Sequence, residues 1–195
     1  MKKKIAILGS TGSIGKCLIN IIKKDKRNFE IILLSADENY KELLKQAKFF
    51  KVKNLIITNQ NSYKKVKENR FYRNMNIYND FNSFRKIFKK KIDYTMSSIS
   101  GIQGLKPTIE IIKYTKKIAI ANKEAIICGW DLIEKRLNKH KTKFIPVDSE
   151  HFSIWYALQE IEKNLIEKIY LTASGGPFLG KSFRKLQKVN IKQVT

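Results

Sequence analysis

The 195-residue sequence has only two cysteines and three prolines, and it contains no long hydrophobic run. Cys17 and Cys128 are isolated in apolar helical patterns, without the spacing of a metal site or the density of a disulfide framework. We therefore expect two reduced, buried thiols and a cytoplasmic location. No window approaches the roughly 20 apolar residues of a membrane span, so we expect neither a signal peptide nor a membrane partner.

Acidic residues are also scarce, since 17 Asp and Glu stand against 40 Lys and Arg, a formal charge of +23. Between Lys45 and Lys91, fourteen basic residues accompany two acids. Such an excess suits a polyanion-binding surface. The lysines are nevertheless spread through the whole chain, and no recognition helix or zinc finger accompanies them. We interpret them as solvated faces and expect no specific nucleic-acid partner; a basic nucleic-acid-binding protein is the alternative that net charge alone supports.

A glycine-rich turn stands at the start of the sequence. The apolar run 4–8 leads directly into Gly9, Gly12 and Gly15, and a helical pattern follows. Glycines at this spacing allow a sharp turn and a close approach of pyrophosphate to the N–H groups of a helix N-terminus. The pattern predicts a nucleotide site, and a tight strand-to-helix turn without a ligand is the alternative.

The rest of the chain alternates between strand and helix patterns, which predicts an α/β fold with a doubly wound, Rossmann-like parallel sheet. The expected strands after the first are 29–35, 54–58, 75–78, 92–98, 118–121 and 143–147, with a further apolar strand near 168–172, and the expected helices after the glycine turn are 40–50, 62–69, 82–90, 101–114 and 124–138.

Asp37 and Glu38 follow the second expected strand, about twenty residues beyond the glycines. An acid at this place usually binds the ribose 2′-hydroxyl of NAD, whereas a base accommodates the 2′-phosphate of NADP. The residues by themselves favour NAD, and an Asx-type turn is the structural alternative.

Two polar clusters follow later strands, at residues 122–124 and 148–151. Asp148 and Glu150 face the same way on an extended segment, where two carboxylates can hold a hard divalent cation. Asn122 and Asp148 are also good helix N-caps, so capping is the alternative for both clusters. Near the C-terminus, the hydroxyl and N–H groups of the turn 174–177 could hold a phosphate, or the turn could be purely structural.

Taken together, four motifs in this order closely resemble the 1-deoxy-D-xylulose 5-phosphate reductoisomerase family. They are GSTGSIG at 9–15, ANKE at 121–124, PVDSEH at 146–151 and TASGGPF at 172–178. The resemblance implies an enzyme of non-mevalonate isoprenoid biosynthesis. Such an enzyme isomerises a sugar phosphate substrate, 1-deoxy-D-xylulose 5-phosphate, at Mg²⁺ or Mn²⁺ and reduces the product with NADPH to 2-C-methyl-D-erythritol 4-phosphate.

The resemblance also implies roles for individual residues. The implied cofactor contacts are Thr11, Gly12, Ser13, Ile14, Asn39, Asn122 and Glu124. The implied substrate contacts are Lys123, Ser149, Glu150 and Ser174, the metal ligands are Asp148 and Glu150, and the catalytic residues are Lys123, Asp148 and Glu150. The ammonium group of Lys123 would neutralise developing oxyanion charge.

The sequence departs from the family pattern in two ways. Asp37 and Glu38 replace the small and the polar or basic residue that relatives often carry near the 2′-phosphate, which leaves the strength of the NADPH preference open. Family members are homodimers about twice as long. We therefore expect an NADPH-binding domain at 1–147 and the incomplete start of an α+β catalytic domain at 148–195, inactive by itself. A non-catalytic dinucleotide-binding fragment or decayed paralogue is the alternative.

Overall fold

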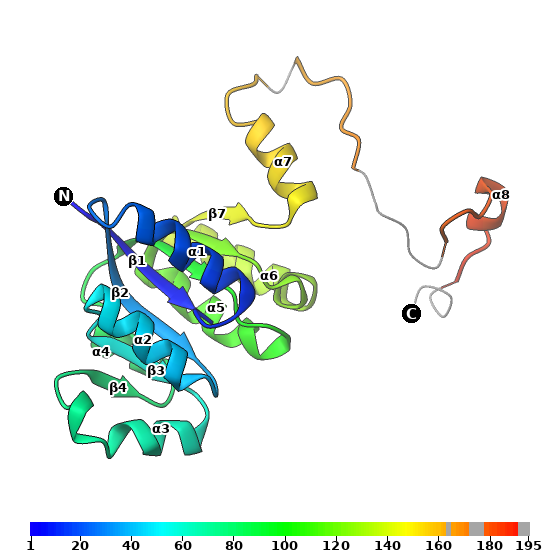
Figure 1. The fold of residues 1–195 in the computed structure, drawn as a ribbon. Coiled ribbons are helices and arrows are strands. Elements are labelled where there is room, and N and C mark those ends of the chain that lie inside the picture. Colours follow the sequence, from blue (N-terminus) through cyan, green and yellow to red (C-terminus); the bar gives the residue numbers. More distant parts are fainter. Residues whose placement is uncertain (163–164, 172–177, 191–195) are drawn as a thin grey trace. The chain divides into compact units, whose positions relative to one another are not determined.

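The computed structural model describes residues 1–162, 165–171 and 178–190. The chain divides into two compact units, Met1–Asp148 and Ser149–Thr195. The first unit contains a single sheet covered by helices, and the described residues of the second form the helices α7 and α8 (Figure 1). The predicted roles of 1–147 in cofactor binding and of 148–195 in catalysis concern function, and they stay predictions.

The sheet of the first unit has seven strands, and all neighbouring strands are parallel. The strands are β1 Lys3–Leu8, β2 Phe29–Ala36, β3 Asn54–Ile57, β4 Asn76–Tyr78, β5 Ile92–Ser97, β6 Thr115–Ile120 and β7 Lys143–Pro146. Their order is β4-β3-β2-β1-β5-β6-β7, so the chain moves outward from β1 in one direction, returns, and then moves outward in the other. This order confirms the predicted doubly wound, Rossmann-like sheet.

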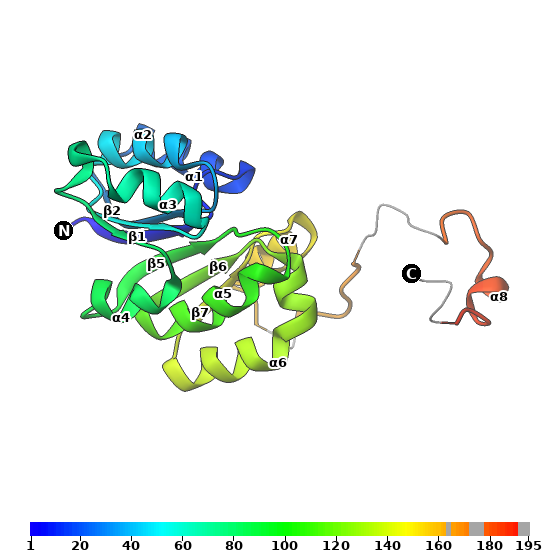
Figure 2. The ribbon, with the colours of Figure 1, turned by 90° about the horizontal axis from the view of Figure 1, so that it is seen from below.

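Helices cover both faces of the sheet (Figure 2). On one face lie α1 Ser13–Lys24, α2 Tyr40–Phe50 and α3 Gln60–Lys67, and on the other lie α4 Phe84–Ile87, α5 Leu105–Ile111 and α6 Lys123–His140. Strand β1 contributes to both cores, because Ile5 and Ile7 pack in the cluster that contains Ile19 of α1, while Ala6 and Leu8 pack in the cluster that contains Ile133 of α6. A strand buried on both faces reads as a continuous apolar run.

Two predicted helices are shorter than expected. The segment 82–90 forms only the 3₁₀ turn η2 Phe81–Ser83 and the single helical turn α4, because Phe88 turns into an extended conformation and is buried. In a longer helix Lys89 would lie one turn after Arg85, and like charges at this i, i+4 spacing disfavour the helix. The segment 101–114 is divided into η3 Ile102–Gly104, α5 and η4 Ile112–Tyr114. Pro107 lies in the first turn of α5, where its missing N–H has no intrahelical partner.

The second unit contains α7 Ser149–Ala157 and α8 Phe183–Leu186. In α7 the ring of Phe152 packs on those of Trp155 and Tyr156, with centroid distances of 5.7 and 5.9 Å. The strand expected near 168–172 is not formed over 168–171, the part of it that the structure describes. A strand needs a hydrogen-bonded neighbour, and the strands in the described ranges pair only with one another in the seven-stranded sheet.

The structure tests the expectation about the two cysteines. Cys17 and Cys128 are free thiols as expected, but both are exposed, so the prediction that they are buried is wrong. Exposed apolar side chains lie near both of them, Ile14 and Ile21 around Cys17 and Ile127 before Cys128, so these apolar patterns do not mark a buried helix face. The reducing, cytoplasmic location inferred from them stays a prediction. Within the described ranges, no helix is long and apolar enough to cross a membrane.

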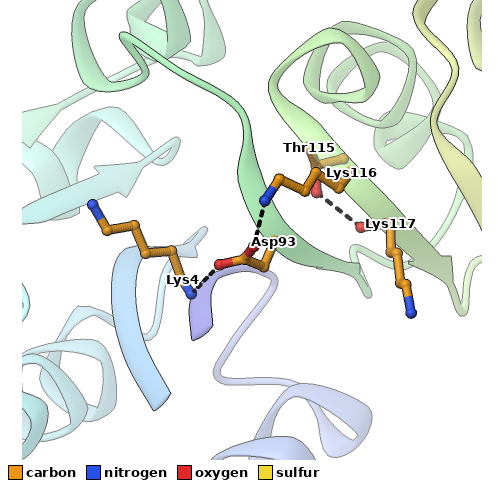
Figure 3. A network of polar contacts seen from close by, with 5 residues as sticks. All are labelled: Lys4, Asp93, Thr115, Lys116 and Lys117. Atoms are coloured by element: carbon orange, nitrogen blue, oxygen red, sulfur yellow. Dashed lines mark hydrogen bonds and ion pairs between the residues drawn. The ribbon is translucent and has the colours of Figure 1, made fainter. Parts of the chain in front are cut away.

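The amino ends of three adjacent strands, β1, β5 and β6, are joined by one carboxylate (Figure 3). Asp93 of β5 accepts a hydrogen bond of 2.9 Å from the main-chain N–H of Lys4 in β1, and its other oxygen lies 2.8 Å from Nζ of Lys116 in β6. The hydrogen bond from Lys116 is the main reason why the pKa of Asp93 lies below its ordinary value. This contact stabilises the edge of the sheet opposite to the glycine turn.

Candidate nucleotide site

A pocket of about 410 Å³ opens at the carboxyl ends of the central strands. It lies where the chain reverses its direction of travel between β1 and β5, which is the place where open parallel sheets bind ligands. The lining residues are Gly9, Thr11, Gly12, Ser35, Ala36, Asp37, Thr58, Phe81, Ser98, Ile99, Ser100 and Gln103. Of the predicted cofactor contacts, Thr11 and Gly12 are therefore part of its wall.

The three glycines of the turn lack a side chain for different structural reasons. Gly9 has a φ of +77°, and a Cβ there would lie 2.6 Å from the main-chain oxygen of Ser98. A Cβ on Gly15 would overlap the main chain of Gly9 and Ser10, so this glycine allows α1 to begin directly above the turn. Gly12 has an ordinary φ of −75°, and the only atom near its Cβ position is Gly9 O at 3.5 Å. The backbone does not require Gly12, so its lack of a side chain serves the pocket.

The turn is held in place by hydrogen bonds from the neighbouring strand and helix. The N–H of Gly9 donates to the Ser35 hydroxyl at 3.0 Å, and the N–H of Ser10 donates to the Ser35 main-chain oxygen at 2.8 Å. The buried Gln46 of α2 donates from Nε2 to Ser10 O at 3.1 Å. The main chain that faces the pocket is therefore pre-organised.

The N-terminus of α1 differs from those of the other long helices. Asn39, Asn59 and Asn122 cap α2, α3 and α6 with their side chains. The corresponding residue of α1 is Gly12, which provides no side-chain cap, and the first turn of α1 contains no acid. The unpaired N–H groups and the positive end of the helix dipole are thus presented to the pocket, as an anion such as pyrophosphate requires. Ser13 and Ile14 belong to this first turn, and both are exposed.

One end of the pocket is formed by the ends of β2 and β3. There the hydroxyl of Thr58 donates to Oδ1 of Asp37 at 2.7 Å. Asn39 lies two residues further on, outside the lining, and its Oδ1 accepts from the N–H of Glu42 at 3.2 Å. The structure thus gives Asn39 the capping role, while Asp37 lies where an acid can meet a ribose.

The opposite wall depends on Asn122, which is buried at the start of α6. Its Oδ1 accepts from the N–H of Ala125 at 2.7 Å, and its Nδ2 donates to the main-chain oxygens of Ile99 and of Gly101, the latter at 2.6 Å. Both polar atoms of this side chain are therefore used within the protein. Lys123 and Glu124 occupy the first turn of α6 and are exposed.

Of the predicted metal and substrate residues, Lys123 and Asp148 are not among those that line this pocket. Asp148 follows β7, at the same edge of the sheet as Gly9 and Asn122. Ser149 and Glu150 begin α7, and the Ser149 hydroxyl donates to Glu150 Oε2 at 3.1 Å. Ser174 lies outside the residues that the structure describes. Over the described ranges, no three His, Cys, Asp or Glu side chains gather closely enough to hold a metal ion.

Sequence reasoning missed most of the wall that follows β5. Ser98, Ile99 and Ser100 line the pocket directly after this strand, and Gln103 and Phe81 also belong to the lining. The carboxyl ends of parallel strands face ligands, but only the strand order places β5 beside β1. The signal that the sequence offers here is the predicted strand 92–98, which ends in two serines.

Two family models match this chain. The model described as 1-deoxy-D-xylulose 5-phosphate reductoisomerase matches residues 5–129, and the model of the C-terminal domain of the same enzyme matches residues 144–195. The two matches follow one another along the sequence, and together they include every motif named above.

Individual proteins are similar over nearly the whole chain. The 1-deoxy-D-xylulose 5-phosphate reductoisomerase of Pelagibacter ubique is 56% identical over 192 residues, which cover 97% of this chain and 50% of that protein. The solved structure of the Zymomonas mobilis reductoisomerase in complex with NADPH has a TM-score of 0.81 at 30% identity and covers 97% of this chain and 50% of that one. A structure of DOX-P reductoisomerase with NADPH, fosmidomycin and magnesium has a TM-score of 0.76 at 30% identity, covering 98% and 50%. The chain spans about half the length of the curated relatives it matches.

Proposed function

The chain belongs to the 1-deoxy-D-xylulose 5-phosphate reductoisomerase family, and we propose that its first unit binds NADPH in the pocket beside the glycine turn. The observation that carries the proposal is the uncapped N-terminus of α1, which faces a pocket at the reversal point of a doubly wound sheet. The open space at Gly12 supports it further, because a pyrophosphate needs main chain without a side chain. The relatives solved with NADPH support the same cofactor.

The pocket suggests an orientation for this cofactor. The pyrophosphate would lie over the turn at Gly12, with hydrogen bonds from the first N–H groups of α1. The adenosine would extend toward Asp37 and Thr58, and the nicotinamide toward the wall at 98–100. Asn122 would act on the cofactor through this wall, since its side chain holds the main chain of residues 99 and 101.

For a protein of the relatives' length we propose the reductoisomerase reaction, in which 1-deoxy-D-xylulose 5-phosphate is isomerised and reduced to 2-C-methyl-D-erythritol 4-phosphate. When bound, the reduced nicotinamide supplies the hydride, and a divalent cation supplies Lewis acidity. Of this chain's residues, Lys123 would stabilise oxyanion charge, and Ser149, Glu150 and Ser174 would bind the substrate. Lys123 is exposed and Glu150 is partly exposed, which suits both for contact with a ligand.

The cation site is the less complete part of the proposal. Asp148 and Glu150 provide carboxylate oxygens, the donors that Mg²⁺ and Mn²⁺ prefer, but such cations take about six oxygen ligands. Because the described residues contain no cluster of three such side chains, we assign these two residues as part of a ligand set. This favours, for the 195-residue chain alone, the alternative of a dinucleotide-binding protein without catalysis. A homodimer and a cytoplasmic location stay predictions.

The experiment that tests cofactor binding is a fluorescence titration of the 195-residue chain with NADPH. We expect saturable binding with enhanced nicotinamide emission, and competition by NADP⁺ but not by free phosphate. An absence of saturable binding up to millimolar NADPH, in a chain that is folded by circular dichroism, would overturn the proposal.

A further inference from the structure

Among the described residues that line the pocket, Asp37 is the one with a charged side chain. It lies at the end of β2, and the ends of β2 and β3 are adjacent, since Ala36 pairs with Ile57. No Lys or Arg accompanies it in the lining; the nearest base in the sequence, Lys41, is exposed on α2. The adenosine end of the pocket is therefore negative although the whole chain carries a charge of +23.

The carboxylate of Asp37 is oriented by a neighbouring strand. The hydroxyl of Thr58 donates to Oδ1 at 2.7 Å, and the N–H of Thr58 is itself fixed by a hydrogen bond of 3.1 Å to Ala36 O. Since the hydroxyl that binds Asp37 comes from a residue anchored to β2, the carboxylate is held at the pocket's edge.

We propose that Asp37 is a specificity-determining residue that binds the hydroxyls of the adenosine ribose and repels a 2′-phosphate, so that NADH competes with NADPH for this pocket. A carboxylate at the end of the second strand accepts hydrogen bonds from the ribose 2′-hydroxyl. A 2′-phosphate placed there brings two negative groups close together, and the like charges repel one another. The proposal rests on the proposed function, because it needs a dinucleotide in this pocket.

In this proposal Thr58 is a positioning residue. Without the Thr58 hydroxyl, Asp37 would keep its charge, but its carboxylate would no longer be held in one orientation. Thr58→Val should therefore change the ratio of the two dissociation constants in the same direction as a substitution of Asp37, but by less. A purely structural role of Thr58 would change thermal stability and leave that ratio unchanged.

The test is a paired titration of the 195-residue chain with NADPH and NADH, followed by nicotinamide fluorescence at fixed ionic strength. For the unaltered chain we expect the two dissociation constants to lie within about tenfold of each other, the ratio that ~1.4 kcal/mol produces. Asp37→Asn, which keeps the shape of the side chain, should tighten NADPH and raise its preference over NADH by about tenfold or more.

Glu134→Gln is the matched control. Glu134 is exposed on α6, lies outside the pocket lining, and carries the same charge as Asp37. Its substitution should shift the preference by less than about twofold, because only the change in net charge remains. A chain that prefers NADPH more than about 100-fold, or an unchanged ratio in Asp37→Asn, would overturn this proposal while leaving NADPH binding intact. Failure of both dinucleotides to bind would instead overturn the proposed function, and this proposal with it.

Discussion

Asn122 and Gly101 are joined by a hydrogen bond of 2.6 Å from the Asn122 side-chain amide to the Gly101 main-chain oxygen. The same side chain caps α6 by accepting from the N–H of Ala125. One buried amide thus fixes the start of a helix and the wall of the pocket at once. Gly104 permits this arrangement, because a Cβ there would overlap the Asn122 amide.

The two roles of Asn122 can be separated by substitution. Asn122→Ala removes the cap and leaves the oxygens of Ile99 and Gly101 without their donor, so we expect unfolding free energy to fall by about 2–4 kcal/mol. Asn122→Ser keeps a capping hydroxyl and should recover about 1 kcal/mol of this loss. Urea denaturation measures both. Equal stability of the two variants would show that the cap contributes nothing. Both should bind NADPH more weakly, since both release the wall.

Gly12 and Gly15 should respond in opposite ways to a side chain. Gly12→Val fits the local backbone, so its melting temperature should stay within a few degrees, while NADPH affinity should fall at least tenfold because the branched side chain occupies the place of the pyrophosphate. Gly15→Ala meets the main chain of Gly9 and should lose about 1–3 kcal/mol of stability. Thermal unfolding and NADPH titration distinguish them. A Gly12→Val chain that binds NADPH normally would contradict the placement of the pyrophosphate.

Asp93 should make a pH-dependent contribution to stability. Its pKa is held below the ordinary value of 3.8, chiefly by the hydrogen bond from Lys116. The stabilisation is therefore present above pH ~4 and is lost as the pH falls through the lowered pKa. Because the pair is partly exposed, we expect Asp93→Asn to cost at most about 1 kcal/mol at pH 7 and less as the pH falls below ~4. Urea unfolding over this pH range measures the cost. The control Asp131→Asn, on the exposed side of α6, removes the same charge away from the sheet.

The 195-residue chain should hold NADPH without turning over substrate. Two carboxylates bind Mg²⁺ weakly, and an open, imprecise site forfeits the roughly 7–11 kcal/mol that positioning can contribute. The measurement is NADPH oxidation with 1-deoxy-D-xylulose 5-phosphate and Mn²⁺. Appreciable turnover by this chain would contradict the prediction.

In a protein of the relatives' length, Asp148→Asn or Glu150→Gln should lower activity by orders of magnitude while NADPH affinity stays almost unchanged. The reason is that the glycine turn and the two carboxylates are separate sets of residues. Turnover and NADPH titration on the same preparation give both quantities. A fully active Asp148→Asn enzyme would remove Asp148 from the cation site.

Much of the fold could be predicted because local and tertiary signals agree. Helix α2 runs over the predicted residues 40–50, since Asn39 caps one end and Lys51 ends it in a left-handed conformation. The helix expected at 82–90 is not formed over its whole length, because Phe88 is buried in an extended conformation. The exposure of the two cysteines could not be predicted from the sequence either, because helical periodicity does not determine which side of a short apolar stretch packs on the sheet.

Only part of the site could be predicted from the sequence, and the reason is the topology of the sheet. The turn at Gly12 has a local signature, and so does the acid at Asp37. Ser98, by contrast, lies 86 residues after Gly12 in the sequence and meets the turn only because β5 pairs with β1. Strand order is set by packing over the whole sheet, and no local pattern encodes it.

The pairing of β1 with β5 also has a consequence for synthesis on the ribosome. Strand β1 can pair with β2 as soon as residues 29–36 are made, but the partner of its other edge is residues 92–97. These residues emerge roughly 5–20 s after β1 at ordinary elongation rates. During that interval the central strand of the future sheet offers unpaired main-chain groups to any neighbouring chain. The lysine-rich stretch that follows Lys45 is made in the same interval, so the nascent chains would repel one another until the edge is closed.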